Sequence, residues 1–142
     1  MNAWICILHL VCTLLMLGVI LFVQVVHYPL FAQVGAESFK RYEALHTVRT
    51  TWVVAPLMVG ELLTALWLAV FPAAPALQWL TLLGLGLVVL IWASTALIQV
   101  PAHAALGEGF DLAVYQRLVR SNWLRTAAWA LRAPIAVLLV AQ

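Results

Sequence analysis

The stretch QVVHYPLFAQVGAESFKRYEALHTVRTTW, residues 24–52, decides the fold, because the chain repeats much of its pattern about 76 residues later, in residues 99–129. The two copies share amides, histidines, aromatic residues and an arginine–threonine pair in the same order. The matched pairs are Gln24 and Gln99, His27 and His103, Phe39 and Phe110, Tyr42 and Tyr115, His46 and Asn122, Arg49 and Arg125, Thr50 and Thr126, and Pro56 and Pro134. A fixed-period echo of this kind indicates a duplicated unit of helix, polar connection and helix.

The composition places the chain in a membrane. Of its 142 residues, 66% are hydrophobic and 8% are charged, and the mean hydropathy is +1.08. Soluble globular domains carry about 25% charged residues, so the lipid bilayer is the expected solvent and partner. The net charge of +2 is small, and no basic run with interleaved aromatic residues occurs outside the polar connections, which excludes a nucleic-acid-binding protein.

Four apolar stretches are long enough to cross about 30 Å of hydrocarbon at about 1.5 Å per residue. Amphipathic runs at the membrane interface are expected to lead into the second and fourth of them. We also expect Tyr28-Pro29 to end the first span and Asp111 to cap the helix that leads into the fourth. The expected spans are residues 3–26, 52–71, 77–100 and 123–142, with a tight turn at residues 72–75.

These features predict an all-α integral membrane four-helix bundle that forms one domain, residues 1–142. Its two-helix repeats are residues 1–71 and 77–142. Two spans per repeat give both copies the same orientation, so the pseudo-twofold axis that relates them would run along the membrane normal. The first span lacks the basic region and cleavage site of a secretory signal peptide, so we expect it to be retained.

Basic residues indicate the orientation. They gather in the two polar connections, whereas the termini and the short turn carry neither lysine nor arginine. The positive-inside rule therefore predicts cytoplasmic connections and termini outside, in a bacterial-type inner membrane. Homo-oligomerisation is left open by the sequence. The basic residues concerned are Lys40, Arg41, Arg49, Arg117, Arg120 and Arg125.

If the two copies pack about that axis, their matched polar residues meet at one depth near the cytoplasmic boundary. Each glutamine of the pattern precedes its histidine by three or four residues and so shares a helix face with it. The mouth of a four-helix bundle is a common place for metal and cofactor sites. The predicted ring comprises His27, His46, His103, Gln24, Gln99, Asn122, Arg49 and Arg125.

Neutral imidazoles bind zinc, copper, iron and nickel, and three that converge would form an open site with room for water, oxygen or a substrate. We therefore predict His27, His46 and His103 as ligands of a transition metal or of haem, with His27 and His103 as an axial pair or one of them as the sole ligand. Arg49 and Arg125 would hold an anionic group of a substrate or cofactor. The predicted cofactor-binding residues are Gln24, Gln99, Asn122 and Arg132.

Glu61 and Arg132 lie well inside their spans, where an unpaired charge costs at least about 2.5 kcal/mol, so we expect them to pair. Their depths differ by about 7 to 8 Å, which a reaching arginine side chain largely closes. Glu61 joins Arg49 and Arg125 as a candidate catalytic residue, because it can bind a metal, relay protons or contact a polar part of a substrate. A purely structural pair is the alternative. His9 is expected to bond to a neighbouring helix.

Two short segments resemble a known family: Tyr42-x-x-Leu45-His46-x-x-Arg49 and Asn122-Trp-Leu-Arg125. On a small four-span chain they are similar to the anthrone-oxygenase-like family of bacterial and fungal membrane proteins. That family carries a polar residue and an arginine at this spacing beside the membrane, and the resemblance covers about a fifth of the chain. The resemblance implies oxygenase activity.

The sequence thus predicts a small membrane oxidoreductase or oxygenase that acts on a lipid-soluble molecule. In this hypothesis the three histidines bind the metal or haem. The alternative is a non-enzymatic membrane protein, such as an assembly partner or a small carrier, in which the same residues only fix helix ends.

Overall fold

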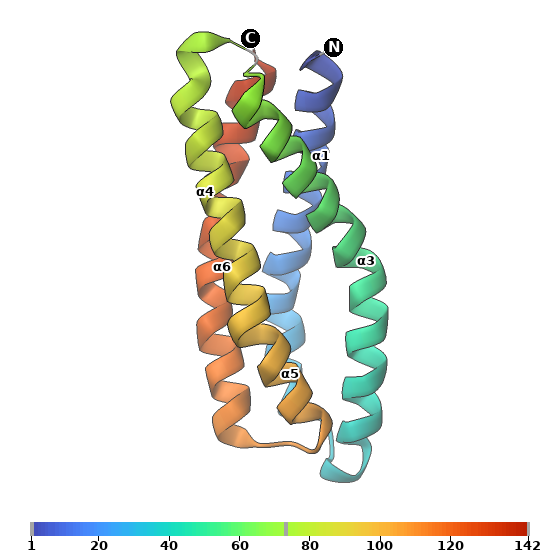
Figure 1. Cartoon of the computed structure of the whole chain (residues 1–142). Helices are drawn as coiled ribbons and strands as arrows, with labels where there is room; N and C mark the ends of the chain where they lie inside the picture. The colour runs from blue at the N-terminus through green and yellow to red at the C-terminus, as the bar shows by residue number, and fades with distance from the viewer. Residues whose placement is uncertain (1, 73, 142) are drawn as a thin grey trace.

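The computed structural model describes residues 2–72 and 74–141, and within them the chain forms four long helical spans packed as a bundle (Figure 1). All four are long and apolar enough to cross a membrane. The predictions of an all-α four-helix bundle and of a multi-pass membrane protein are confirmed. The elements are α1 (Asn2–Phe22), η1 (Val23–His27), α2 (Tyr28–Phe31), α3 (Ala36–Val70), η2 (Pro75–Leu77), α4 (Gln78–Ser94), η3 (Thr95–Gln99), α5 (Val100–Gly107) and α6 (Leu112–Val140).

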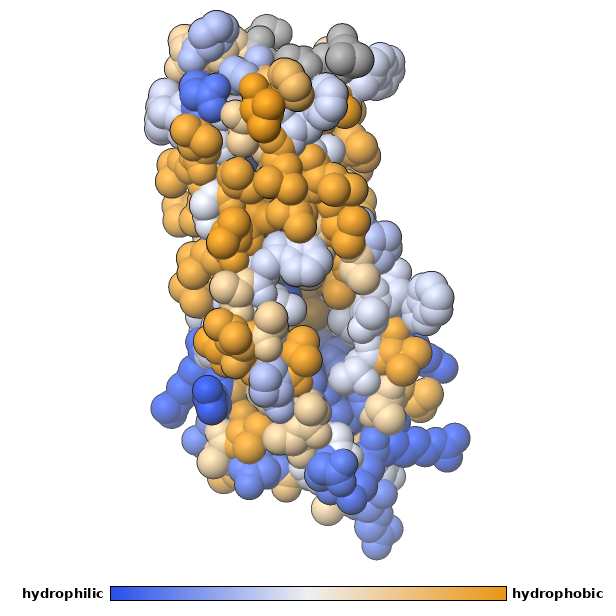
Figure 2. Space-filling view, viewed as in Figure 1, coloured by the Kyte–Doolittle hydropathy of each residue, from blue (hydrophilic) through white to orange (hydrophobic). Residues whose placement is uncertain are grey.

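The two ends of the bundle differ in character. The start of α1, the end of α6 and the turn after α3 lie at one end, and both polar connections lie at the other (Figure 1). Figure 2 shows hydrophilic side chains concentrated at the end with the polar connections and hydrophobic ones over the middle. Helix α1 packs against α3 and α6, and α4 packs against α6 and α3. The histidine-bearing segments therefore meet at the polar end.

Helices α3 and α6 extend through stretches that the sequence interpretation assigned to the membrane interface. Helix α3 is continuous from Ala36 to Val70, and α6 begins at Leu112. The predicted amphipathic stretches therefore continue into the second and fourth spans as single helices, and the span starts at residues 52 and 123 stay predictions. Some polar side chains of these stretches face the bundle interior, where Glu43 is 1% exposed and Asn122 is fully buried.

Proline ends neither the first span nor the third. Pro29 lies in the first turn of α2 and Pro101 in that of α5, and a π-helical segment precedes each. Proline lacks an N–H and crowds the carbonyl four residues back, and a π turn shifts the local hydrogen bonding so that the helix continues. The prediction that Tyr28-Pro29 ends the first span is wrong. Both π segments fall at matching places of the predicted repeats, but the duplication itself stays a prediction.

The start of α6 follows the predicted capping chemistry. Asp111 is the N-cap, and its side-chain oxygen accepts a hydrogen bond from the backbone N–H of Val114 at 2.9 Å. Such a bond satisfies one of the donors left free in the first turn of a helix. Gly109 has a φ of 148°, a conformation that side-chain-bearing residues rarely adopt, and so allows the tight connection from α5.

The predicted ion pair between Glu61 and Arg132 is present. Nη1 of Arg132 lies 2.7 Å from Oε1 of Glu61, both side chains are 1% exposed, and Nε1 of Trp129 donates to the other carboxylate oxygen at 2.9 Å. Nη2 of Arg132 lies 3.3 Å from Nε2 of His9, whose Nδ1 lies 2.8 Å from the hydroxyl of Thr64. Because arginine can only donate, Nε2 of His9 accepts and Nδ1 carries the proton. This network joins α1, α3 and α6, and it confirms the expected bond of His9 to a neighbouring helix.

Replacement of Arg132 by methionine should lower the free energy of unfolding by about 3–5 kcal/mol, because it leaves the Glu61 carboxylate buried without its counterion. The double variant Glu61→Leu with Arg132→Met should recover most of that loss, since it removes both desolvation penalties. Thermal unfolding of the purified protein in detergent, followed by circular dichroism, measures both effects. The exposed Leu131→Met on the same helix serves as the control. A double variant as unstable as the single one would contradict this account.

Candidate metal centre and its cavity

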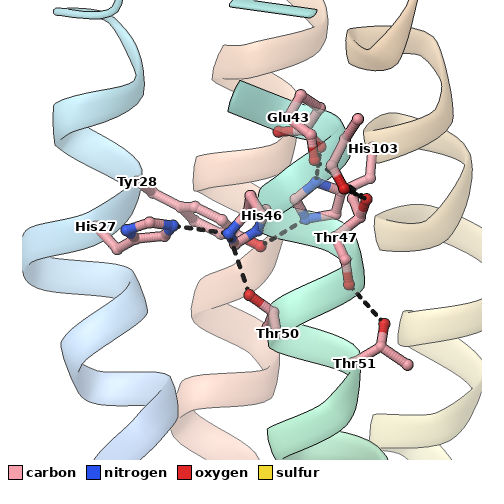
Figure 3. Close-up of polar contacts among 9 residues, drawn as sticks. His27, Tyr28, Glu43, His46, Thr47, Thr50, Thr51 and His103 are labelled. Atoms are coloured by element: carbon pink, nitrogen blue, oxygen red, sulfur yellow. Dashed lines mark hydrogen bonds and ion pairs between the residues drawn. The ribbon is translucent and has the colours of Figure 1, made fainter. Parts of the chain in front are cut away.

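The structure brings the three predicted histidines together at the polar end of the bundle (Figure 3). His27 ends η1, His46 lies on α3 and His103 lies on α5. Nε2 of His27 and Nδ1 of His46 are 2.8 Å apart, within hydrogen-bond distance, and the ring centres of His46 and His103 are 5.2 Å apart. Imidazoles from three separate segments thus form one cluster.

A carboxylate and a phenol complete this cluster. Oε1 of Glu43 lies 2.5 Å from Nδ1 of His103, and the Tyr28 hydroxyl lies 3.0 Å from Nε2 of the same ring (Figure 3). Glu43 and Tyr28 are both buried. The carboxylate accepts the Nδ1 proton, which fixes the tautomer of His103 in the way that carboxylates orient histidine ligands in metal sites. Tyr28 then donates its hydroxyl proton to Nε2.

Glu43, His46 and His103 form a group that can hold a metal ion. Each offers one ligand atom, and these atoms lie within 4.8 Å of one another. With metal–ligand bonds of about 2.0–2.2 Å, neighbouring ligand atoms lie about 3.0–3.5 Å apart in a tetrahedral site or on one face of an octahedral site, so side-chain movements of about an ångström would close the site. Oε2 of Glu43 is buried without a hydrogen-bond partner in the part of the chain that the structure describes. A carboxylate and two imidazoles suit zinc or non-haem iron, so the donor set fits a transition metal.

The neighbours of His46 hold its ring in place. Nε2 of His27 and the hydroxyl of Thr50 both lie within hydrogen-bond distance of its Nδ1, at 2.8 and 3.1 Å. Phe31 packs edge-on against both imidazoles, with ring centres 5.1 Å from each. These contacts occupy Nδ1 of His46 and leave Nε2 as its available ligand atom. His27 thus contacts the three-residue group through His46.

The predicted amides join helices to one another. Nδ2 of Asn122 donates to Oε1 of Gln24 at 2.8 Å, and Nε2 of Gln24 donates to a backbone carbonyl of α6 at 3.2 Å. Gln99 accepts from Ser94 at 2.9 Å and donates to Ser121 at 3.2 Å. The two glutamines therefore tie η1 and η3, the segments that carry or precede the histidines, to α6. Cofactor binding by these amides stays a prediction.

The predicted charged residues fall in three different places. Arg125 is buried beside the histidine cluster, with its guanidinium carbon 5.3 Å from the ring centre of Trp129. Arg49 is exposed and lines a separate hollow between α1 and α3, together with His27. Glu61 and Arg132 pair with each other in the opposite half of the bundle. Their predicted catalytic and cofactor-binding roles stay predictions.

A cavity of about 450 Å³ adjoins the candidate metal group and extends toward the middle of the bundle. Pockets of roughly 300–1,000 Å³ are the usual size for small-molecule sites. Figure 2 shows the surface hollowed between α3 and the α4–α5 segment. The polar wall includes Tyr28, Glu43, His46, Gln99, His103 and Arg125, and the apolar wall includes Met16, Val19, Ile20, Val23, Val54 and Met58.

Sequence reasoning missed Glu43 and Tyr28. Glu43 precedes His46 by three residues, which is the Glu-x-x-His spacing with which helical bundles present metal ligands, so a signal for it was available. Tyr28 carries no such signal, because its contact with His103 joins positions 75 residues apart. The prediction of metal ligands used the histidines alone and therefore did not include the carboxylate of Glu43.

Comparison of the chain with protein-family models, with curated proteins and with solved structures finds no match. The resemblance to the anthrone-oxygenase-like family stays a prediction.

Asn122→Ala should lower the free energy of unfolding by about 1–3 kcal/mol, because it leaves the Gln24 amide oxygen buried without its donor. Metal binding should be unchanged, since Asn122 bonds to Gln24 and not to the candidate metal group. Chemical denaturation in detergent together with a metal titration measures both quantities. The exposed Gln116→Ala on the same helix is the matched control. Lost metal binding at unchanged stability would instead assign Asn122 to cofactor binding.

Proposed function

We propose that the protein is a metal-dependent membrane oxidoreductase or oxygenase that acts on a lipid-soluble molecule. The supporting observation is that Glu43, His46 and His103, the group that can hold a metal, also line the cavity. Two histidines and one carboxylate with open positions form the donor set of non-haem iron oxygenases. The mostly apolar cavity wall favours an apolar substrate and limits water at the site, which favours redox chemistry over hydrolysis.

Each residue of the cluster has a distinct role in this proposal. A bound iron ion would supply electron transfer and the activation of dioxygen. Glu43 would orient His103 with one oxygen and contribute the other, unpartnered oxygen to the ion. His27 and Thr50 would fix the ring of His46. Tyr28 holds a hydroxyl proton at the cavity wall, 3.0 Å from Nε2 of His103, and can donate it to a neighbouring group.

A metal ion fits the cluster better than haem does. His46 lies 2.8 Å from His27 and has its ring centre 5.2 Å from that of His103, so it occupies the space beside both. An axial pair made of His27 and His103 would require His46 to move aside. The proposed cofactor is therefore a transition-metal ion, and an absorption spectrum tests the haem alternative.

The proposal includes a cellular setting. Lys40, Arg41, Arg117 and Arg120 belong to the polar end of the chain, and the positive-inside rule places that end in the cytoplasm. The candidate metal group would then lie near the cytoplasmic side of a bacterial-type inner membrane, with both termini outside. Oxygenase activity is also what the resemblance to the anthrone-oxygenase-like family implies.

A non-enzymatic role is the second candidate. It is favoured by the way in which the cluster forms hydrogen bonds within itself, from His27 to His46 and from Tyr28 through His103 to Glu43. Such a closed network can fix the helix ends of an assembly partner or a small carrier without any metal.

A metal titration distinguishes these candidates. Protein purified in detergent, stripped with a chelator and titrated with Fe²⁺, Co²⁺ or Zn²⁺ should bind about one ion per chain. Glu43→Gln, His46→Gln and His103→Gln should each lower the affinity at least about tenfold, because each removes a ligand. Glu37→Gln, an exposed glutamate on the same helix, should not change it.

Circular dichroism verifies that each variant retains its helices, and elemental analysis and an absorption spectrum of the protein as isolated complete the experiment. A Soret band in the absorption spectrum would show that the cofactor is haem and not a single metal ion. Colourless protein at full yield that binds no ion more tightly than its variants do would refute the metal site and favour the non-enzymatic role.

A further inference from the structure

Arg125 is a buried cation without a counterion. Its side chain is 7% exposed, and its Nε has no hydrogen-bond acceptor and its guanidinium no carboxylate partner within residues 2–72 and 74–141. By contrast, Arg132, the other buried arginine, lies 2.7 Å from Glu61. The ring of Trp129 faces the Arg125 guanidinium at 5.3 Å, which offsets only part of the desolvation of a full charge. The charge of Arg125 therefore lacks an anion.

The unpartnered guanidinium belongs to the cavity wall. Among the lining residues that the structure describes, Glu43 is the one carboxylate, and one of its oxygens already lies 2.5 Å from His103. Away from this polar end the wall is mainly aliphatic and thioether side chains, including Met16, Ile20 and Met58, with the hydroxyls of a few threonines. One uncompensated positive charge at the end of an apolar space matches a molecule with one negative group and an apolar body.

The cavity opens on the side of the bundle. Its lining includes Thr51 on α3 and Val100 and Ala104 on α5, which are exposed at the surface. Figure 2 shows the hollow between these helices, bordered by side chains of mixed and mostly intermediate hydropathy, with the most hydrophilic ones nearer the end of the bundle. A mouth on the side of a membrane-spanning bundle adjoins lipid, which gives a lipophilic molecule a route into the cavity from the bilayer.

We propose that the cavity binds a lipophilic monoanion, either a carboxylate or an ionised phenol, whose charged oxygen accepts hydrogen bonds from the Arg125 guanidinium. The apolar body of the ligand lies among Met16, Ile20, Val54 and Met58. This proposal specifies the substrate class of the proposed function, and it rests on that function in treating the bound anion as a substrate. The binding step itself needs no metal, because the guanidinium alone supplies the charge.

The arrangement also predicts how metal and anion influence each other. A divalent ion at Glu43, His46 and His103 would, together with Arg125, outweigh the single carboxylate of Glu43. Anion affinity should therefore rise when the metal is bound, and a neutral ligand of the same shape should gain nothing. By linkage, the anion should tighten metal binding by the same factor.

The test uses metal-free full-length protein in nanodiscs of zwitterionic lipid, with binding measured by native mass spectrometry. The probes are dodecanoate, methyl dodecanoate and an acidic alkylated nitrophenol. Dodecanoate or the nitrophenol should bind at least about tenfold more tightly than the neutral ester, and the stronger of the two identifies the head group. Arg125→Gln should abolish this preference, whereas Arg125→Lys should retain part of it.

The exposed Arg120→Gln on the same helix is the matched control and should retain the full preference. Val54→Trp, which fills the apolar wall, should weaken acid and ester alike. If Arg125→Gln does not fold, the ratio of the affinities for dodecanoate and methyl dodecanoate in the unmodified protein still tests whether the cavity prefers an anion. Equal affinities for acid and ester, or an unchanged preference in Arg125→Gln, would overturn the proposal. Anion binding without any metal binding would support this site and refute the metal-dependent function. Metal binding without a preference for the anion would refute this site and leave the metal-dependent function in place.

Discussion

The absence of water in the bilayer interior is the constraint on which this structure depends. A polar group inside the bundle must find its partner within the protein, because lipid offers none. Glu61 and Arg132 meet this requirement with an ion pair that also engages Trp129 and His9. Gln24 and Asn122 meet it by bonding to each other. The first set of contacts joins α1, α3 and α6 in one half of the bundle, and the second joins η1 to α6 in the other. Apolar packing alone discriminates poorly between helix arrangements in lipid.

Several buried polar atoms nevertheless lack a hydrogen-bond partner among the described residues, including atoms of Thr13, Trp92, Asn122 and Arg132. Two others belong to the candidate site. Oε2 of Glu43 and Nε of Arg125 are buried without hydrogen-bond partners among the described residues, and both belong to residues that line one cavity. In the two proposals, a metal ion would be the partner of the carboxylate and an anionic ligand that of the guanidinium. The polar interior thus comprises a network around Glu61 and Arg132 and a candidate site around Glu43, His103 and Arg125.

Much of the fold followed from local chemistry. Hydropathy and length predicted the spans, and the cost of an unpaired intramembrane charge predicted the Glu61–Arg132 pair. The end of the first span at Tyr28-Pro29 was predicted wrongly, because a proline rule for a single segment does not foresee a π turn. π segments carry the helices through Pro29 and Pro101. The site was predicted in part, as three histidines without the carboxylate.

The sequence by itself determined the solvent and the number of long helices, because hydrophobicity and helical length are additive along the chain. It also put His27, His46 and His103 near the same end of the bundle, because each lies close to a polar connection. Only the tertiary structure decided which polar groups satisfy one another and which face a cavity. It placed Glu43 against His103, and it separated Arg125 from Arg49, although both arginines occupy matching positions in the pattern. The physical reason is that pairing in a dry interior depends on distances of a few ångströms between separate helices, and no spacing along one chain encodes these.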